Sequence, residues 1–369
     1  SIEKVIPIAL RTNLLFSGLF TILAGFCPEM LMRIFTNDAA LVASGSQYLR
    51  AVALSYVLCG ISQVYLILLK NTGHAAVSSR ISSTAVVLNI ILNAILIYGL
   101  CGAPALGIRG AAYATVAARV VELIWAYLET KKPERVRILW NRLFSSAGKI
   151  LSEDFWRYTL PVLAASLVWG IAYVLYSVIM GHMGSDAVAA NSITSIAKSL
   201  LSCLIRGVSG GAGVLIGNLL GANELEKARE YGRRLSHLSI AIGIVTGGLL
   251  MLISPAIVHF APLSDTAAEY LQYMLLFCGL NLMAQSVNTT VLDGIFCAGG
   301  DAKFDMQGNI GAMWCFSVPL GFLAAFWLKL PVMVVYCIVN LDEIVKLPAV
   351  YHHYKKYIWV RNITRDVED

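Results

Sequence analysis

The sequence is short of charge. Asp, Glu, Lys and Arg make up only 14% of its 369 residues, whereas 58% are hydrophobic, and the mean hydropathy is +0.71. A soluble globular chain carries about 25% charged residues. This shortage excludes an ordinary soluble protein and indicates a chain that crosses a membrane many times. The net charge of +6 needs no nucleic-acid partner, because membrane orientation and anionic lipid headgroups account for basic loops.

The sequence also lacks the usual marks of catalytic and metal sites. Its eight cysteines are scattered through apolar segments and never occur in a CxxC or similar paired spacing, so disulfides and cysteine metal sites are not expected. There is no Walker A or HExxH motif, and the histidines lie in loops or near helix ends. We therefore expect neither an enzyme nor a cofactor.

Short alternating strands are missing too. The hydrophobic segments are instead long, continuous and rich in Leu, Ala and Gly, which is typical of membrane helices. Each is long enough to cross a hydrocarbon core of ~30 Å. We predict an all-α polytopic membrane protein with ten helices, at about 12–35, 46–69, 81–101, 106–129, 156–180, 187–218, 234–259, 267–296, 304–328 and 331–353.

Basic residues are concentrated in alternate loops. Arg80, the linker 131–149, the run 227–234, Lys303 and the tail after Lys355 hold most of them. The positive-inside rule makes these loops cytoplasmic, so we expect the C-terminus inside the cell. Near these ends lie possible interfacial anchors, Trp140, Trp156 and Trp359.

Residues 35–132 and 260–356 look like two copies of one unit, about 225 positions apart. A repeat of this length, made of membrane helices, is typical of transporters built from two pseudo-symmetric lobes. The matches are Phe35 with Phe260, Gln47-Tyr48 with Gln272-Tyr273, and Asn71-Thr72-Gly73-His74 with Ala298-Gly299-Gly300-Asp301.

The repeat predicts the organisation of the chain. We expect an N-terminal lobe of four helices at 1–130, a basic cytoplasmic linker at 131–154, a C-terminal lobe of six helices at 155–354 and a cytoplasmic tail at 355–369. The helices expected at 156–180 and 187–218 lie ahead of the second copy, and their counterparts would lie before Ser1. We therefore expect twelve helices in the natural protein, two of them N-terminal to this sequence. A naturally shortened protein is the alternative.

Several motifs now occur in a consistent order. Pro161 and Trp169 share one helix, and the stretch Met180-Gly-His-Met-Gly-Ser-Asp-Ala-Val-Ala-Ala-Asn191 follows. Gly217-Asn-Leu-Leu-Gly-Ala222 comes next, and Gly294-Ile-Phe296 lies before the glycine turn. Together these motifs resemble the bacterial branch of the MATE (multidrug and toxic compound extrusion) family, over the whole chain from the third of twelve expected helices.

This resemblance implies two lobes around a central cavity that opens alternately to either side of the bacterial cytoplasmic membrane. It implies export of amphipathic, often cationic compounds in exchange for H⁺ or Na⁺. We expect a small-molecule substrate, contact with the lipid bilayer and a monomer. A lipid-linked oligosaccharide flippase of a related helix plan is the alternative, although such proteins usually add helices beyond twelve.

Polar residues inside a bilayer are costly and mark candidate sites. On segment 187–218, Lys198 and Arg206 lie on one helical face with several serines. They line the cavity in one interpretation. In the other, Lys198 reaches toward the outer surface and Arg206 ties helices together through backbone carbonyls. Segment 156–180 places Ser166, Trp169 and Tyr173 on one face, either as an aromatic substrate surface or as ordinary packing residues.

Further candidates lie in both lobes. Segment 267–296 carries Asn281, Gln285, Asn288 and Asp293, and the repeat pairs Asn288 with Gln63. Asp293 either carries a proton or caps the 297–303 turn. Asn89, with Asn93 one turn later, either faces a cavity or bonds between helices.

Charged pairs stand near the end of each repeat, Arg119 with Glu122 and Glu343 with Lys346. We interpret them as local salt bridges near the cytoplasmic face, and a gate between the lobes is the alternative.

The chain departs from the resembling family at two positions. Ser166 and Asn309 stand where many bacterial members carry carboxylates, so coupling through those two groups is not expected. The remaining candidates for ion coupling are Lys198, Arg206 and Asp293, or residues of the two helices expected before Ser1.

Overall fold

The structure is a computed structural model that describes residues 2–35, 39–132 and 149–361. Every regular element in this part of the chain is helical, which confirms the predicted all-α fold. The chain divides into two compact units, Ser1–Phe155 and Trp156–Asp369. Most of the predicted linker, and with it Trp140, lies outside the described residues, and α7 already begins at Lys149.

The first unit contains α1 (Ile2–Phe26), α2 (Pro28–Phe35), α3 (Ala39–Val52), α4 (Leu54–Leu69), α5 (Ala75–Tyr98) and α6 (Ile108–Thr130). The predicted helix 12–35 is wrong in its bounds, because the chain is interrupted at Cys27. Helices α4 and α5 are joined by the π-helical turn η1 (Lys70–His74), where Gly73 adopts a φ of 85°. A positive φ suits glycine because it has no Cβ.

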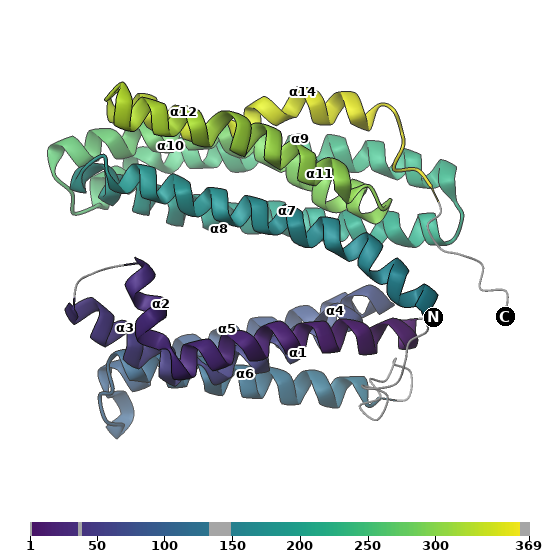
Figure 1. The fold of residues 1–369 in the computed structure, drawn as a ribbon, viewed down its shortest axis with the longest axis horizontal. Helices are drawn as coiled ribbons and strands as arrows, with labels where there is room; N and C mark the ends of the chain where they lie inside the picture. The colour runs from purple at the N-terminus through teal and green to yellow at the C-terminus, as the bar shows by residue number, and fades with distance from the viewer. Residues whose placement is uncertain (1, 36–38, 133–148, 362–369) are drawn as a thin grey trace. The chain divides into compact units, whose positions relative to one another are not determined.

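The second unit contains α7 (Lys149–Gly181), α8 (Ser185–Gly221), α9 (Leu225–Phe260) and α10 (Asp265–Thr289), which continues into the π-helical turn η4 (Thr290–Phe296). Next come α11 (Ala302–Asn309), η5 (Ile310–Ser317), α12 (Val318–Phe322) and η6 (Leu323–Trp327). The last helices are α13 (Val332–Val339) and α14 (Asp342–Tyr354) (Figure 1).

Eight helices of the described chain are long and apolar enough to span a membrane. Two differences separate this number from the predicted ten. The predicted segments 46–69 and 81–101 fall largely within one 45-residue stretch, Leu54–Tyr98, which bends at Gly73. The predicted segment 331–353 is broken at Asn340 and Leu341, so neither α13 nor α14 is long enough by itself.

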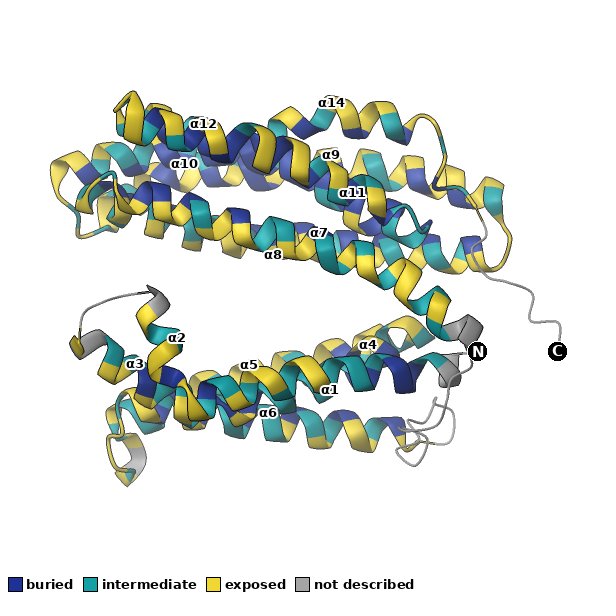
Figure 2. Ribbon diagram, viewed as in Figure 1, coloured by how far each residue is buried: buried dark blue, intermediate teal, exposed yellow. Residues whose placement is uncertain are grey.

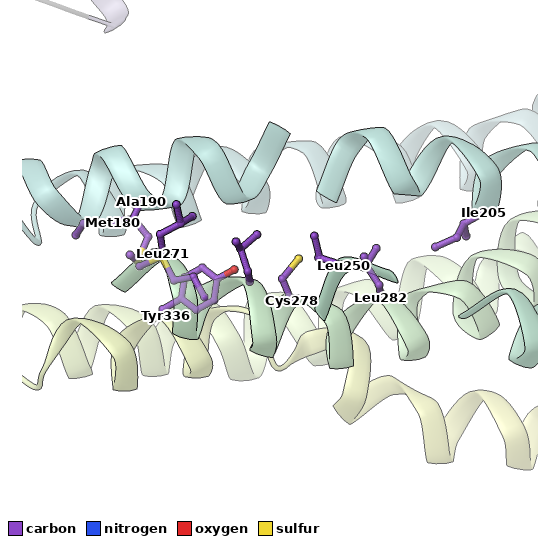
Figure 3. Packing of buried hydrophobic residues seen from close by; sticks show 11 residues of the cluster. Met180, Ala190, Ile205, Leu250, Leu271, Cys278, Leu282 and Tyr336 are labelled. Carbon is purple, nitrogen blue, oxygen red and sulfur yellow. The ribbon is translucent and has the colours of Figure 1, made fainter. Parts of the chain in front are cut away.

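Helix α10 is the centre of the second unit. Within Asp265–Phe296, 67% of the most apolar window is buried, against 33% or less in the other spans. It contacts α8, α9, α13 and α14, and its residues Leu271, Cys278 and Leu282 join the core shown in Figure 3. Glycines at the α9 contact, Gly243 and Gly247, let the two backbones approach closely.

Both units carry many exposed large apolar side chains, including Leu200 and Leu252 in the second unit. Figure 2 shows exposed residues recurring along the helices beside buried ones. An apolar exterior around a partly polar interior is expected for helices that contact lipid. The chain is therefore a multi-pass membrane protein.

The end of the second unit is closed by Trp359, which is fully buried. The expectation that Trp359 is an interfacial anchor is wrong. Its ring faces Gly232 of α9, where an added Cβ would come within 2.5 Å of it. Arg361 then donates hydrogen bonds to the carbonyl oxygens of Gly299 and Gly300, at 3.0 and 2.9 Å.

Candidate functional site

The second unit contains a polar cavity of ≈ 330 Å³, bounded by α7, α8, the α10–η4 helix, α11 and α14. The surrounding helices are apolar, so a polar lining at this depth is costly and points to function. Its walls include most of the predicted site residues of this unit: Ser166, Trp169, Arg206, Gln285, Asn288, Asp293 and Asn309. Asp305, Glu343 and Lys346 complete the charged part of the lining.

The break between α13 and α14 brings charged residues into this cavity. Asn340 leaves the helical conformation, with φ −98° and ψ 13°, and α14 begins at Asp342. The side-chain amide of Asn281 donates to the freed carbonyl oxygen of Asn340 at 2.6 Å. The first turn of α14 therefore lies beside α10, with Asp342 and Glu343 buried in the unit. Acidic side chains also suit the positive end of a helix dipole.

Lys346 lies at the centre of a charged network on this turn. Its ammonium donates to Oε1 of Glu343 and to Oδ1 of Asn309, both at 3.1 Å. Oδ2 of Asp342 lies 3.9 Å away. Only 5% of Lys346 is exposed, and only 7% of Glu343. The sequence analysis interpreted Glu343 and Lys346 as a local salt bridge, and the i, i+3 contact is present. It did not predict that both residues are buried.

Two amides extend the network to neighbouring helices. Asn288 of α10 donates from Nδ2 to Oε2 of Glu343 at 2.8 Å and to the Glu343 carbonyl oxygen at 2.7 Å. Asn309 donates to Oδ1 of Asp305 at 3.1 Å. Asn309 therefore links a carboxylate one turn earlier, Asp305, to the ammonium of Lys346.

Asp293 lies on η4 beside this network, where it is exposed to the cavity. It does not cap the 297–303 turn, because the amides of Gly299 and Asp301 bond to the backbone oxygens of Ile295 and Phe296. The π-helical turn η4 packs against α8, where Ser209 donates to the carbonyl oxygen of Thr289 at 2.9 Å. This contact fixes the position of Asp293 relative to α8.

Aromatic and cationic residues form the neighbouring wall. Trp169 and Tyr173 stack with ring centroids 5.4 Å apart, and the guanidinium of Arg206 lies 5.8 Å from the Trp169 ring. Trp169, Arg206, Gln285 and Glu343 also line a second cavity of ≈ 200 Å³, which continues the first. Lys198 lines this second cavity and donates to Oδ1 of Asn281 at 3.0 Å. The interpretation that Lys198 reaches toward the outer surface is wrong.

Ser166 lines the cavity, but its hydroxyl donates back to the carbonyl oxygen of Val162 at 3.0 Å. This bond leaves the hydroxyl as an acceptor for a ligand. The aromatic face of α7 therefore offers one weak polar group beside two flat rings.

The first unit contains a smaller counterpart of the network. Glu122 is almost fully buried and pairs with Arg119, and Ser62 donates to its Oε1 at 3.4 Å. The residue that contacts Glu122 is thus Ser62. The predicted site residue Gln63, next to it in the sequence, is half-buried. Asn89 donates to the hydroxyl of Thr115 at 3.4 Å, which agrees with an interhelical bond.

The charged groups that the sequence analysis left outside the site are Asp305, Asp342, Glu343 and Lys346. Glu343 and Lys346 carried a signal, since they occupy the position matched by Arg119 and Glu122 in the repeat. Asp342 carried none, because 331–353 looks like one uninterrupted helix.

The cavity is lined by three carboxylates, Asp293, Asp305 and Glu343, and by two cations, Arg206 and Lys346. Carboxylates buried with fewer cations around them favour uptake of positive charge. Among residues 2–35, 39–132 and 149–361, no three His, Cys, Asp or Glu side chains are placed to hold a metal ion by themselves. The aromatic wall beside the carboxylates provides a surface for a flat apolar molecule.

Comparison with known proteins supports a transport role. The MatE family model matches residues 1–95 and 161–323. The uncharacterized transporter YisQ of Bacillus subtilis is 20% identical over 358 residues, which cover 97% of this chain and 78% of YisQ. The probable multidrug resistance protein NorM of Thermotoga maritima is 24% identical over 330 residues, 87% of this chain and 70% of NorM.

A solved structure of similar fold is a MOP superfamily transporter from Pyrococcus furiosus. It superposes with a TM-score of 0.84 at 19% identity, over 96% of this chain and 78% of that one. A crystal structure of a MATE protein in complex with MaL6 gives 0.83 at 20% identity, over 96% and 79%. With the family match covering most of its length, this chain belongs to the MatE family, that of the MATE multidrug efflux transporters.

Proposed function

We propose that this protein is a secondary-active antiporter that exports amphipathic small molecules in exchange for H⁺ or Na⁺, by alternating access of its two lobes. The observation that carries the proposal is the network of Asp305, Asn309, Glu343 and Lys346 at a cavity of the C-terminal unit. Net negative charge buried among apolar helices is costly unless a cation or proton joins it. A group of this kind can therefore convert an ion gradient into a change of conformation.

The neighbouring wall supports an amphipathic substrate. The stacked rings of Trp169 and Tyr173 offer a flat apolar surface. Neither Lys198 nor Arg206 forms an ion pair with an acid of the described chain, so both can meet an anionic group of a substrate. Carboxylates on the opposite side can meet a cationic group. Organic cations, zwitterions and anionic metabolites that carry an aromatic ring are the substrate classes that fit.

The cellular setting follows from the same proposal. A bacterial cytoplasmic membrane, a cytoplasmic C-terminus and a monomer fit a MATE-type exporter. The basic residues of the predicted cytoplasmic loops support that orientation.

The test is efflux of ethidium from cells that express the protein, with the Na⁺ gradient and the proton gradient collapsed separately. We expect efflux that stops when one of the two gradients is lost. Glu343→Gln should abolish gradient-driven efflux. The matched control is Glu224→Gln, because Glu224 pairs with Lys227 on an exposed surface. Absence of efflux under every gradient, with the protein present in the membrane, would remove drug export. Equal efflux by the two variants would remove the role of the network.

A further inference from the structure

The network contains a cation that belongs to the chain itself. The ammonium of Lys346 lies 3.1 Å from Oε1 of Glu343, 3.1 Å from Oδ1 of Asn309 and 3.9 Å from Oδ2 of Asp342. An ammonium group is a compact point charge that contacts oxygen ligands through three N–H groups. Carboxylate and amide oxygens are also the ligands that hard metal cations take. Lys346 thus stands where a small inorganic cation would find its ligands.

A metal ion cannot easily displace this ammonium. Lys346 is tethered one turn from Glu343, so it acts at a high effective concentration. It is 5% exposed, and moving it away would leave both its own charge and the Glu343 carboxylate unpaired in an apolar environment. A second cation placed beside it would be repelled by the charge already present.

Removal of the ammonium would leave oxygen ligands at its position. Without the Lys346 ammonium, Oε1 of Glu343 and Oδ1 of Asn309 would be free to accept a cation. Two further amide oxygens, Oδ1 of Asn288 and Oε1 of Gln285, are buried and have no hydrogen-bond partner among the described residues. Asn288 is 1% exposed and Gln285 9%, and both line the cavity. Neither of these two acceptors bonds to Lys346, so the ligands at the ammonium position itself are Oε1 of Glu343 and Oδ1 of Asn309.

We propose that Lys346 is a built-in counter-cation that occupies the ion position of this network and excludes Na⁺ from it. In terms of the proposed antiport, on which this role in coupling rests, transport through the C-terminal unit is then independent of Na⁺. The residue determines ion specificity by filling the site, whereas Glu343 and Asn309 supply the ligands.

The test measures Na⁺ binding through the thermal unfolding of the purified protein in detergent micelles, at constant pH and ionic strength, in NaCl or choline chloride. Lys346→Met removes the charge at similar size. We expect the Tm of this variant to rise with Na⁺ concentration beyond any rise in the wild type, because ligands that bind only the folded state stabilise it. Lys346→Arg keeps the charge and should show no such gain. The exposed Lys227→Met is the matched control.

A double variant tests whether the gain arises in this network. Glu343→Gln with Lys346→Met should lose the added Na⁺ response, because the main ligand charge is gone. The proposal is overturned if folded Lys346→Met responds to Na⁺ no more than the wild type. It is also overturned if Glu343→Gln alone removes a Na⁺ response of the wild type, since Na⁺ would then bind beside Lys346. The latter comparison needs no variant at Lys346. Because the readout is unfolding, it does not depend on whether the protein exports ethidium.

Discussion

Replacing Asn288 by Ala removes the two hydrogen bonds that an α10 amide donates to Glu343. The variant loses hydrogen bonds of 2.8 Å to the Glu343 carboxylate and 2.7 Å to the Glu343 carbonyl oxygen. Measurements in soluble proteins assign about 1.5–3 kcal/mol to a hydrogen bond with a charged group and about 0.5–1.5 kcal/mol to a neutral one. Side-chain hydrogen bonds between membrane helices average about 0.6 kcal/mol and reach about 1.7 kcal/mol. Since Lys346 still pairs with Glu343 in this variant, we expect the free energy of unfolding to fall by about 2 kcal/mol.

Gln285→Ala is the matched control for this prediction. Gln285 lies one turn earlier on the same helix, and its Oε1 has no partner among the described residues. Its removal eliminates an unsatisfied acceptor and breaks no bond of its Oε1, so the free energy of unfolding should fall by less than in Asn288→Ala. The measurement is equilibrium unfolding by SDS in mixed micelles, with an Asn288→Ala and Glu343→Gln double-mutant cycle. Equal losses for the two amide variants, or a coupling energy of zero, would refute the hydrogen-bonding argument.

Three more variants test other contacts. Gly294→Ala should lower the free energy of unfolding by about 1–3 kcal/mol, because its Cβ would lie 2.9 Å from a backbone oxygen of α8, whereas Gly211→Ala has open space and should be neutral or stabilising in the same unfolding assay. Trp359→Ala should cost about 3–5 kcal/mol by thermal unfolding, because the side chain is fully buried; a loss below about 1 kcal/mol would contradict its place in the core. Trp169→Ala should weaken binding of aromatic cations by about 0.5–2 kcal/mol in a fluorescence titration, and the exposed Trp327→Ala should leave it unchanged.

The sequence was sufficient to predict the fold class because membrane helices are specified by length and composition alone. Glycine turns were also predictable, and Gly73 and Gly300, matched by the repeat, both have positive φ. The break at Asn340 was not predictable. The surrounding residues 331–353 are as apolar as a continuous helix, and the break is stabilised by Asn281 from a distant part of the chain.

Only part of the candidate site could be predicted, because spacing within one helix does not show which helices meet. Trp169, Arg206 and Gln285 each belong to a polar or aromatic face of their own helix, which the spacing of residues revealed. All three line the cavity. Lys346 could not be placed, because an i, i+3 charge pair looks the same on a surface as in a buried network. Only the contacts with Asn309 and Asn288, which lie on other helices, distinguish the two.

The burial of Trp359 bears on the order in which the protein is made. Its indole fills the notch at Gly232 and joins a core with Ile216 of α8 and Phe296 of η4. A ribosome releases residue 359 after all of these helices, so they are synthesised before the side chain that completes their contact. During that interval the notch is unfilled and its apolar walls are available to chaperones and membrane proteases. The contact between Trp359 and Gly232 can therefore form only after α8, α9 and η4 have all been synthesised.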